Sequence, residues 1–153
     1  MNIKYVLGQM VLALVTSAAF ASEPASLSQV KTIILRYPTK SDGGNEEGQA
    51  MAAVVLTEME SRLAKTGVSL TNDDSTADAE MLIALNESSS YSFNEMTGGG
   101  TKYSVSVGVR VLALPSRRPL FAATAGNKND ELDDACTKAA KGIVKKFAKA
   151  WTK

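Results

Sequence analysis

Apolar and polar residues alternate most strictly between positions 103 and 113. One side of this run carries Tyr103, Val105, Val107, Val109, Val111 and Ala113. The residues between them include Ser104, Ser106, Gly108 and Arg110. Because successive side chains of a β-strand point to opposite faces, this period of two predicts a strand with one buried face, as in an antiparallel sheet.

Three consecutive glycines, Gly98 to Gly100, separate this run from a second alternating run that starts at Glu80. Glycine between two alternating runs predicts a β-hairpin. No helix follows the glycines, so they lack the helix N-terminus with which glycine-rich loops bind phosphate. We therefore interpret them as the bend of a hairpin.

The predicted hairpin is longer than the first predicted helix. Strands over residues 80–93 and 101–114 would each extend ~45 Å, against ~30 Å for that helix. We therefore predict that the hairpin tip projects past the helical layer. With a turn centred on Thr97, Tyr91 would face Tyr103, with Phe93 nearer the turn. These three aromatic residues are candidate partner-binding residues, through side-chain anchoring or edge-strand pairing. The alternative is a mobile loop whose aromatic residues cover the sheet edge.

Two segments show the spacing of amphipathic helices. In residues 46–66, apolar side chains recur every three or four residues, and Gly67 follows where a helix commonly ends in a left-handed residue. From about Asp130 to the end, one stripe carries Leu132, Cys136, Ala139, Ile143, Phe147 and Trp151. Each stripe predicts a helix packed on the core by one face.

Shorter strands are predicted over residues 30–37, 68–71 and 120–125 from their β-branched and apolar content. The predicted order is β-α-β-β-β-β-α, with no linker or change of composition. We predict a single α+β domain over residues 30–153. It has a mostly antiparallel or mixed sheet with two amphipathic helices packed on one face.

The first 21 residues have the order of a secretory signal peptide. Lys4 precedes an apolar stretch, and Ala19-Phe20-Ala21 is a small-x-small cleavage site. An uncleaved N-terminal anchor is the alternative. Residues 22–29 are predicted to form a polar leader. The residue directly after the cleavage site is Ser22, so there is no cysteine there to carry a lipid. We expect export to the periplasm and a soluble protein after cleavage.

Composition excludes several functions. Lys4 is the one charged residue among the first 21, so the remainder carries 16 Lys and Arg against 16 Asp and Glu. Such a balance disfavours nucleic-acid binding, which needs a basic surface. The chain contains no histidine, which removes the commonest general base and the commonest zinc ligand. Cys136 is the only cysteine, so no intramolecular disulfide can form.

The motifs that suggest catalysis occur in the wrong context. Ser28-Gln29-Val30-Lys31 fits S-x-x-K and Lys65-Thr66-Gly67 fits K-T-G of serine β-lactamases. Here, however, the first runs into a strand and the second closes a helix, so we regard both as chance. Asp73, Asp74 and Asp78 lack the spacing of a calcium loop and are interpreted as turn and capping residues. We predict no cofactor, metal site or catalytic residue.

The last helix has a polarised charge pattern. Acidic residues lie at its start, and lysines follow at positions 138, 141, 145, 146, 149 and 153. This order complements the helix dipole, but six lysines exceed the last turn. The alternative is a basic face for anionic lipid or cell-wall polymer, with Lys141, Lys145 and Lys149 as candidate residues.

Four segments carry a resemblance to small envelope domains of Gram-negative bacteria. They are ESRLAKTGVSLT, ADAEMLIALNESSS, YSVSVGVRVLALPSRRPLF and the terminal amphipathic helix. In this pattern the chain resembles domains of the CsgG, LpoB and TolB N-terminal types. It departs from them in lacking a lipobox cysteine and in carrying Pro-Ser-Arg-Arg-Pro after the long strand. The resemblance implies a binding role in the envelope.

We therefore predict a non-catalytic binding or accessory module of cell-envelope assembly or secretion that acts through protein–protein contacts. Its expected partners are envelope proteins, with self-association and contact with anionic lipid or cell-wall polymer left open. Two alternatives remain. One is a small hydrolase that uses carboxylates, since glycoside hydrolysis needs no histidine. The other is an oligomer-forming structural subunit.

Overall fold

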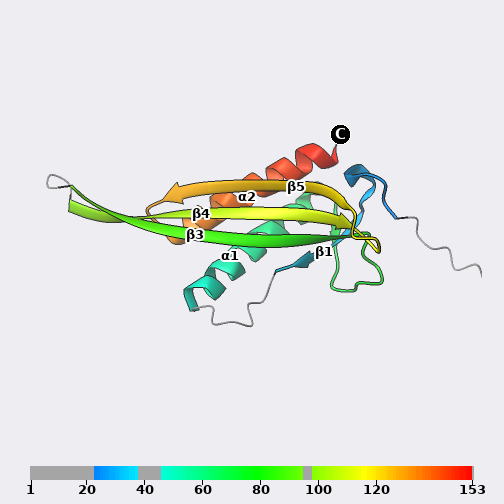
Figure 1. Ribbon diagram of the computed structural model, residues 1–153, viewed down its shortest axis with the longest axis horizontal. Coiled ribbons are helices and arrows are strands. Elements are labelled where there is room, and N and C mark those ends of the chain that lie inside the picture. Colours follow the sequence, from blue (N-terminus) through cyan, green and yellow to red (C-terminus); the bar gives the residue numbers. More distant parts are fainter. Residues whose placement is uncertain (1–22, 38–45, 95–97, 153) are drawn as a thin grey trace, which may run out of the picture.

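The computed structural model describes residues 23–37, 46–94 and 98–152, so the predicted signal peptide lies outside the described residues. The described strands are β1 (Thr32–Arg36), β2 (Ser69–Leu70), β3 (Ala79–Asn94), β4 (Gly98–Ala113) and β5 (Pro119–Asn129). The helices are α1 (Glu46–Leu63) and α2 (Leu132–Trp151), with short 3-10 turns η1 (Leu27–Gln29) and η2 (Ala64–Thr66). This order confirms the predicted β-α-β-β-β-β-α arrangement (Figure 1).

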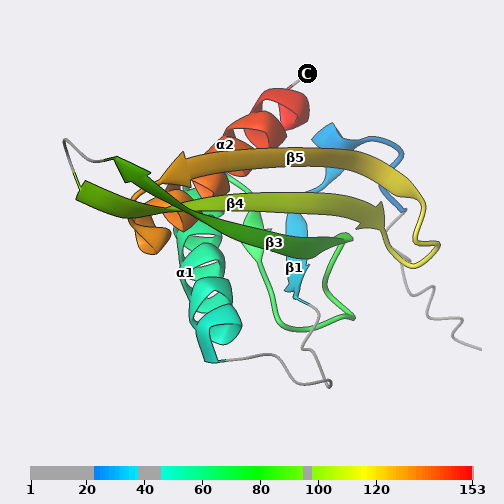
Figure 2. The ribbon, with the colours of Figure 1, turned by 60° about the vertical axis from the view of Figure 1, so that its left-hand side comes forward.

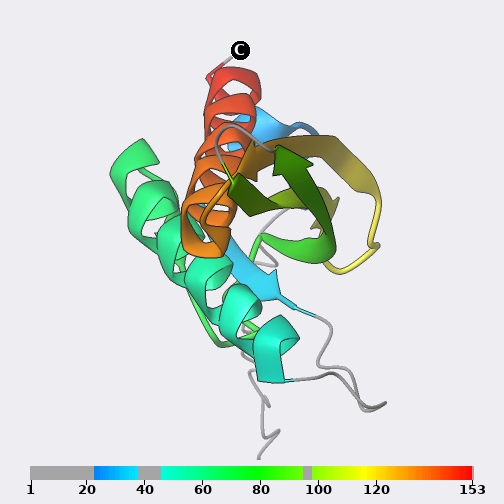
Figure 3. The ribbon, with the colours of Figure 1, turned by 90° about the vertical axis from the view of Figure 1, so that its left-hand side faces the viewer.

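The strands form one mixed sheet in the order β2-β1-β3-β4-β5. Strand β1 runs parallel to both β2 and β3, whereas β3, β4 and β5 form an antiparallel meander. Both helices lie on the same side of the sheet, as Figures 2 and 3 show. The α+β class and the one-sided helical layer were therefore predicted correctly.

The hydrophobic core fills the space between the sheet and the helices. The predicted apolar side of β4 faces it, and Val105, Val107, Val109, Val111 and Ala113 are all buried. The α2 stripe meets this face, with Cys136, Ala139, Ile143 and Phe147 buried. Both elements bury one apolar side in this interface. The strand period of β4 and the helical period of α2 therefore identified them in the sequence.

The end of α1 is locked to the end of α2. The helix tightens into η2, and Gly67 follows with a left-handed φ of 96°, as its C-cap position predicted. Gly67 backs onto the ring of Trp151, whose Nε1 donates a hydrogen bond to the carbonyl oxygen of Val30 at 2.9 Å. The C-terminal turn of α2 is thereby joined to the segment that precedes β1.

The register predicted for the hairpin was wrong by two residues. Tyr91 pairs with Thr101 instead of Tyr103, and Asn94 pairs with Gly98. The glycines continue the strand β4 and do not form the bend, because their backbone pairs with residues 92–94 of β3. A shift of two keeps every side chain on its predicted face, since the strand period is two.

Strand β5 is longer than predicted. The sequence indicated a strand over residues 120–125, but pairing with β4 extends to Asn129, opposite Tyr103. The last residues, GNKN, carry no apolar signal because their support comes from backbone pairing with β4. A register shift between Val111 and Leu112 marks a bulge near the start of β5.

Candidate functional site

The hairpin of β3 and β4 projects beyond the rest of the sheet. Strand β5 makes its last pair at Tyr103, whereas β3 and β4 continue to pair as far as Asn94 and Gly98. In Figures 1 and 2 this end of the ribbon extends past both β5 and the helices. The projecting arm is therefore a two-stranded ribbon with solvent on both faces, and we refer to residues 90–94 and 98–102 as the arm.

Tyr91 is the exposed large hydrophobic residue among the described side chains, at 67 %. Its ring lies across Gly99, because a Cβ placed on that glycine would overlap the Tyr91 hydroxyl group. Glycine 99 therefore provides the space in which this aromatic ring rests. The ring thus leans toward the end of the arm.

Tyr91 and Tyr103 do not face each other as the predicted register implied. Tyr103 pairs with Ser89, is half-buried and packs against the core. Tyr91 lies on the same face but leans toward Gly99, away from Tyr103. Phe93 pairs with Gly99 through its backbone, and its side chain lies outside the described residues. Tyr91 therefore presents the exposed aromatic surface, and Tyr103 joins the arm to the core.

The three predicted lysines lie on a different surface. Lys141, Lys145 and Lys149 are exposed on α2, and their spacing of four places them along one side of the helix. No ion pair joins them to another described residue, whereas Lys138 pairs with Asp134 at 3.4 Å. Figure 1 shows α2 running from the arm end of the sheet toward the opposite end. The lysines are therefore separate from the arm.

The acidic residues of the loop before β3 bind the protein's own chain. Both the Lys31 and the Thr32 backbone N–H groups donate to Asp78 at 2.9 Å. Ser75 donates to Asp73 through its backbone N–H at 2.9 Å and its hydroxyl at 2.7 Å, which lowers the pKa of Asp73.

These contacts agree with the interpretation of the acidic residues as turn and capping groups. Asp74 completes the set by forming an ion pair with Arg36. Within residues 23–37, 46–94 and 98–152, no group of three or more His, Cys, Asp or Glu side chains is arranged to hold a metal ion.

Cys136 is buried in the α2 interface, as its place on the apolar stripe predicted. Burial, assisted by the negative charges of Asp133 and Glu87, raises the pKa of the thiol to about 11. The thiol is therefore protonated at neutral pH, and a protonated buried thiol is a poor nucleophile. Its role in this structure is to fill space between α2 and the sheet.

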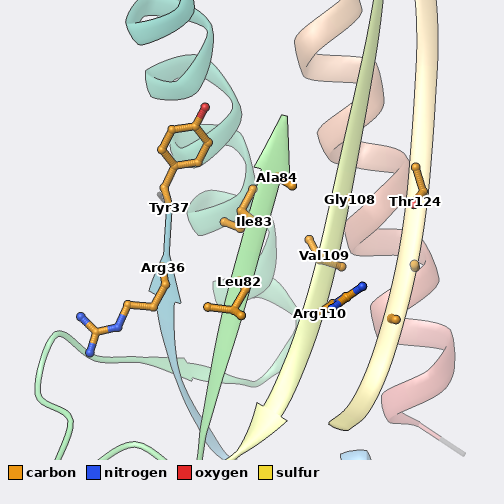
Figure 4. Close-up of a pocket in the computed structure, with 11 residues that line it drawn as sticks. Arg36, Tyr37, Leu82, Ile83, Ala84, Gly108, Val109, Arg110 and Thr124 are labelled. Atoms are coloured by element: carbon orange, nitrogen blue, oxygen red, sulfur yellow. The ribbon is translucent and has the colours of Figure 1, made fainter. Parts of the chain in front are cut away.

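A groove lies on the sheet face that the helices leave open, and the sequence did not predict it. This groove has a volume of about 720 Å³ and crosses the sheet from β1 to β5 (Figure 4). Its floor includes Ala84, Gly108 and Thr124, which pair across the three strands and have small side chains. Exposed Arg110 projects from β4, while Arg36 lies at the far side and pairs with Asp74. The small residues at alternate positions were visible in the sequence, but they do not reveal that a groove forms.

None of the described helices combines the length and apolarity required to cross a membrane.

Comparison with known proteins shows similarity of fold. No protein-family model matches the sequence, and no significant match to a curated protein was found. A minor lipoprotein from Acinetobacter baumannii superposes with a TM-score of 0.51 at 13% identity, covering 78% of this chain and 91% of that protein. The PelC dodecamer from Paraburkholderia phytofirmans gives a TM-score of 0.50 at 13% identity, covering 80% of this chain and 92% of that one.

At this level of identity the similarity concerns the fold alone. The chain shares its fold with a protein described as a lipoprotein, which agrees with the predicted resemblance to envelope domains in general. Neither of these two proteins is named as a CsgG, LpoB or TolB type.

Proposed function

We propose that this protein is a non-catalytic binding module of the bacterial cell envelope that holds a partner protein with its projecting arm. The observation that carries the proposal is the arm itself, which extends past β5 and the helices (Figure 1) and carries Tyr91, 67 % exposed, on its β3 strand. Exposed aromatic side chains provide much of the binding energy at protein interfaces. A long ribbon that serves only to stabilise the core would not need to extend beyond it.

The envelope location is supported by the fold shared with an Acinetobacter baumannii lipoprotein and by the signal-peptide pattern of residues 1–21. The periplasm and the finer likeness to CsgG, LpoB or TolB domains belong to the proposal. Fractionation of cells that express the complete chain tests the location. Recovery in the cytoplasmic fraction at full length would contradict it.

Partner binding is tested by a photo-crosslinking residue placed at position 91. Cells that produce this variant are irradiated, and crosslinked envelope proteins are identified by mass spectrometry. A matched control carries the same residue at Ser104, which is exposed on β4 on the face of the sheet opposite to Tyr91. We expect a discrete adduct from position 91, lost when residues 94–101 are trimmed, and none from position 104. Equal capture from both positions, or no capture from position 91, would contradict binding through the arm.

The exposed lysines of α2 are proposed as a second contact, with anionic lipid or cell-wall polymer. Lys141, Lys145 and Lys149 present three unpaired positive charges on one side of the helix among the described residues. Each lysine near an anionic surface contributes about 1 kcal/mol to binding. Changing all three to Glu should abolish sedimentation with anionic vesicles at low salt. Unchanged sedimentation of that variant would exclude this contact.

A further inference from the structure

The two long edges of the antiparallel sheet present unpaired backbone groups. The N–H of Ala113 donates to the oxygen of Arg118 at 2.8 Å, on the β5 side, and the N–H of Leu114 donates to Asp78 at 2.9 Å, on the β3 side. Because these directions alternate along a strand, odd residues of β4 bond toward β5 and even residues bond toward β3. In this register the backbone N–H and C=O groups of the even residues of β5 and of the odd residues of β3 point away from β4.

The β5 edge is capped by a lysine. Thr124 is one of the even residues of β5, and its carbonyl oxygen accepts a hydrogen bond from Nζ of Lys146 on α2. The long side chain reaches from the helical layer to the outward side of the edge strand. Lysine at a sheet edge is a common means of preventing a second strand from pairing there.

Within residues 23–37, 46–94 and 98–152, no lysine caps the β3 edge in this way. Strand β1 covers it only as far as the pair between Arg36 and Leu82. Beyond that point the outward residues are Leu85, Glu87, Ser89 and Tyr91, whose backbone groups have no outward hydrogen bond to any described residue. Residues 86–91 are all exposed, contain no proline and carry one charge. These features are typical of an edge that can receive another strand.

We propose that two copies of this chain pair through their β3 edges, antiparallel, about a twofold axis at Ser89. Since only the odd residues of β3 point their backbone N–H and C=O groups outward, odd residues must pair with odd residues across the axis. A centre at Ser89 places Ser89 opposite itself and Glu87 opposite the uncharged Tyr91 of the second copy, so no two like charges face each other. A centre at Glu87 would instead place two carboxylates opposite each other, which is destabilising.

The projection of the arm gives this pairing the room it needs. Each arm extends past its own helices, so antiparallel pairing places the two helical layers at opposite ends of the shared strand pair. The paired stretch, residues 85–93, would be ~30 Å long at about 3.3 Å per residue. The contact uses the same edge on both copies and closes after two, because the β5 edge of each copy remains capped by Lys146. This inference is independent of the envelope partner proposed above.

Opposite charges at the axis provide the test. The complete chain is expressed with Ser89→Lys or with Ser89→Asp and purified after any processing by the cell, and its mass is measured by light scattering and sedimentation. We expect the wild-type protein to be a dimer and each variant to be a monomer, because two like charges then meet at the axis. An equimolar mixture of the two variants should restore a dimer. Ser104→Lys adds the same charge to exposed β4, away from the edge, and should remain dimeric.

A disulfide gives a second, independent measurement. Residues directly opposite in an antiparallel pair have Cα atoms about 5.5 Å apart, within the range that a disulfide bridges. Ser89→Cys should therefore crosslink two copies under mild oxidation, whereas Ser104→Cys should not, and buried Cys136 should not contribute. A monomeric wild-type protein, a dimer that persists in Ser89→Lys, or failure of Ser89→Cys to crosslink would each overturn the inference. Capture of an envelope partner from position 91 could still succeed in any of these cases.

Discussion

Gly142 allows α2 to lie close to β5, and its replacement tests how tightly these elements are packed. A Cβ on Gly142 would lie 2.9 Å from the Cβ of Ala125, closer than non-bonded carbon atoms approach in proteins. The Ala125 Cβ is fixed to the strand backbone and cannot rotate away. Space for even one methyl group would therefore require the helix and the sheet to move apart.

Two effects of Gly142→Ala oppose each other. Alanine in place of glycine favours a helix by about 1 kcal/mol. Adding a methyl group to a close-packed interface costs about 1 to 3 kcal/mol. Because α2 carries seven buried residues that would move with it, we expect the packing cost to exceed the helical gain, with a net destabilisation of ~1 kcal/mol. For a chain of this size, that loss lowers the Tm by about 3 to 5 °C.

The assay is urea unfolding followed by circular dichroism and by Trp151 fluorescence, with Ala125→Gly as the matched partner. Ala125→Gly removes the opposing methyl group, so the double variant should recover the stability lost in Gly142→Ala. Its coupling energy should be ~1 kcal/mol or more, as for residues in direct contact. If Gly142→Ala alone stabilises the protein by the full helical gain, the close approach of α2 and β5 is refuted.

Three further predictions concern stability. Glu80 is buried and pairs with Nη2 of Arg117 at 2.6 Å, so Arg117→Ala should destabilise the fold by about 2 to 3 kcal/mol in urea unfolding; no loss would show that the ion pair is not needed. Trp151→Phe removes the donor to Val30 and should cost about 1 to 2 kcal/mol, measured by thermal unfolding, and an unchanged Tm would contradict this. The thiol of Cys136 has its pKa raised from 9.0 to about 11, so the unfolded chain loses its proton first and stability should fall between pH 9 and 11. Cys136→Ala should lack this part of the pH dependence, and an unchanged profile would contradict it.

The sequence predicted the elements that meet in the core because burial leaves a periodic pattern. Val105 to Val111 alternate because one face of β4 is covered, and Cys136 and Phe147 recur at helical spacing because one side of α2 is covered. Each pattern reports a constraint on side chains, and the side chains are what the sequence encodes directly. The order of the elements followed from the same information.

The register of the hairpin could not be obtained from that pattern. Pairing Tyr91 with Thr101 or with Tyr103 gives the same faces, so the hydrophobic pattern does not distinguish them. Glycines favour bends, which placed the expected turn too near them. In the structure Gly99 instead accommodates the Tyr91 ring within the strand pair. Such a contact between neighbouring strands depends on the register, so it cannot be predicted before the register is known.

The lysines of α2 illustrate a similar limit at the candidate site. Their positions were consistent both with the helix dipole and with a basic surface. Lys146, one of the same run, instead reaches the carbonyl oxygen of Thr124 and caps the edge of β5. Thr124 lies 22 residues from Lys146 in the sequence, and only the folded structure brings these two residues together. Lys141 and Lys145 have no such contact among the described residues and remain the candidates for an external one.

The composition of the arm links its two proposed contacts. A two-stranded ribbon alone is at best marginally stable in water, and beyond Tyr103 the arm has neither β5 nor a helix beside it. Glycines and serines give it few side-chain contacts, apart from Tyr91 across Gly99 and the ion pair of Lys102 with Asp130 at 3.7 Å. A third strand added at the β3 edge would supply the missing backbone hydrogen bonds, whereas an envelope protein bound through Tyr91 would cover one face. Amide exchange separates them, because strand addition should protect the outward amides of Glu87, Ser89 and Tyr91 in the purified protein, before any partner is added.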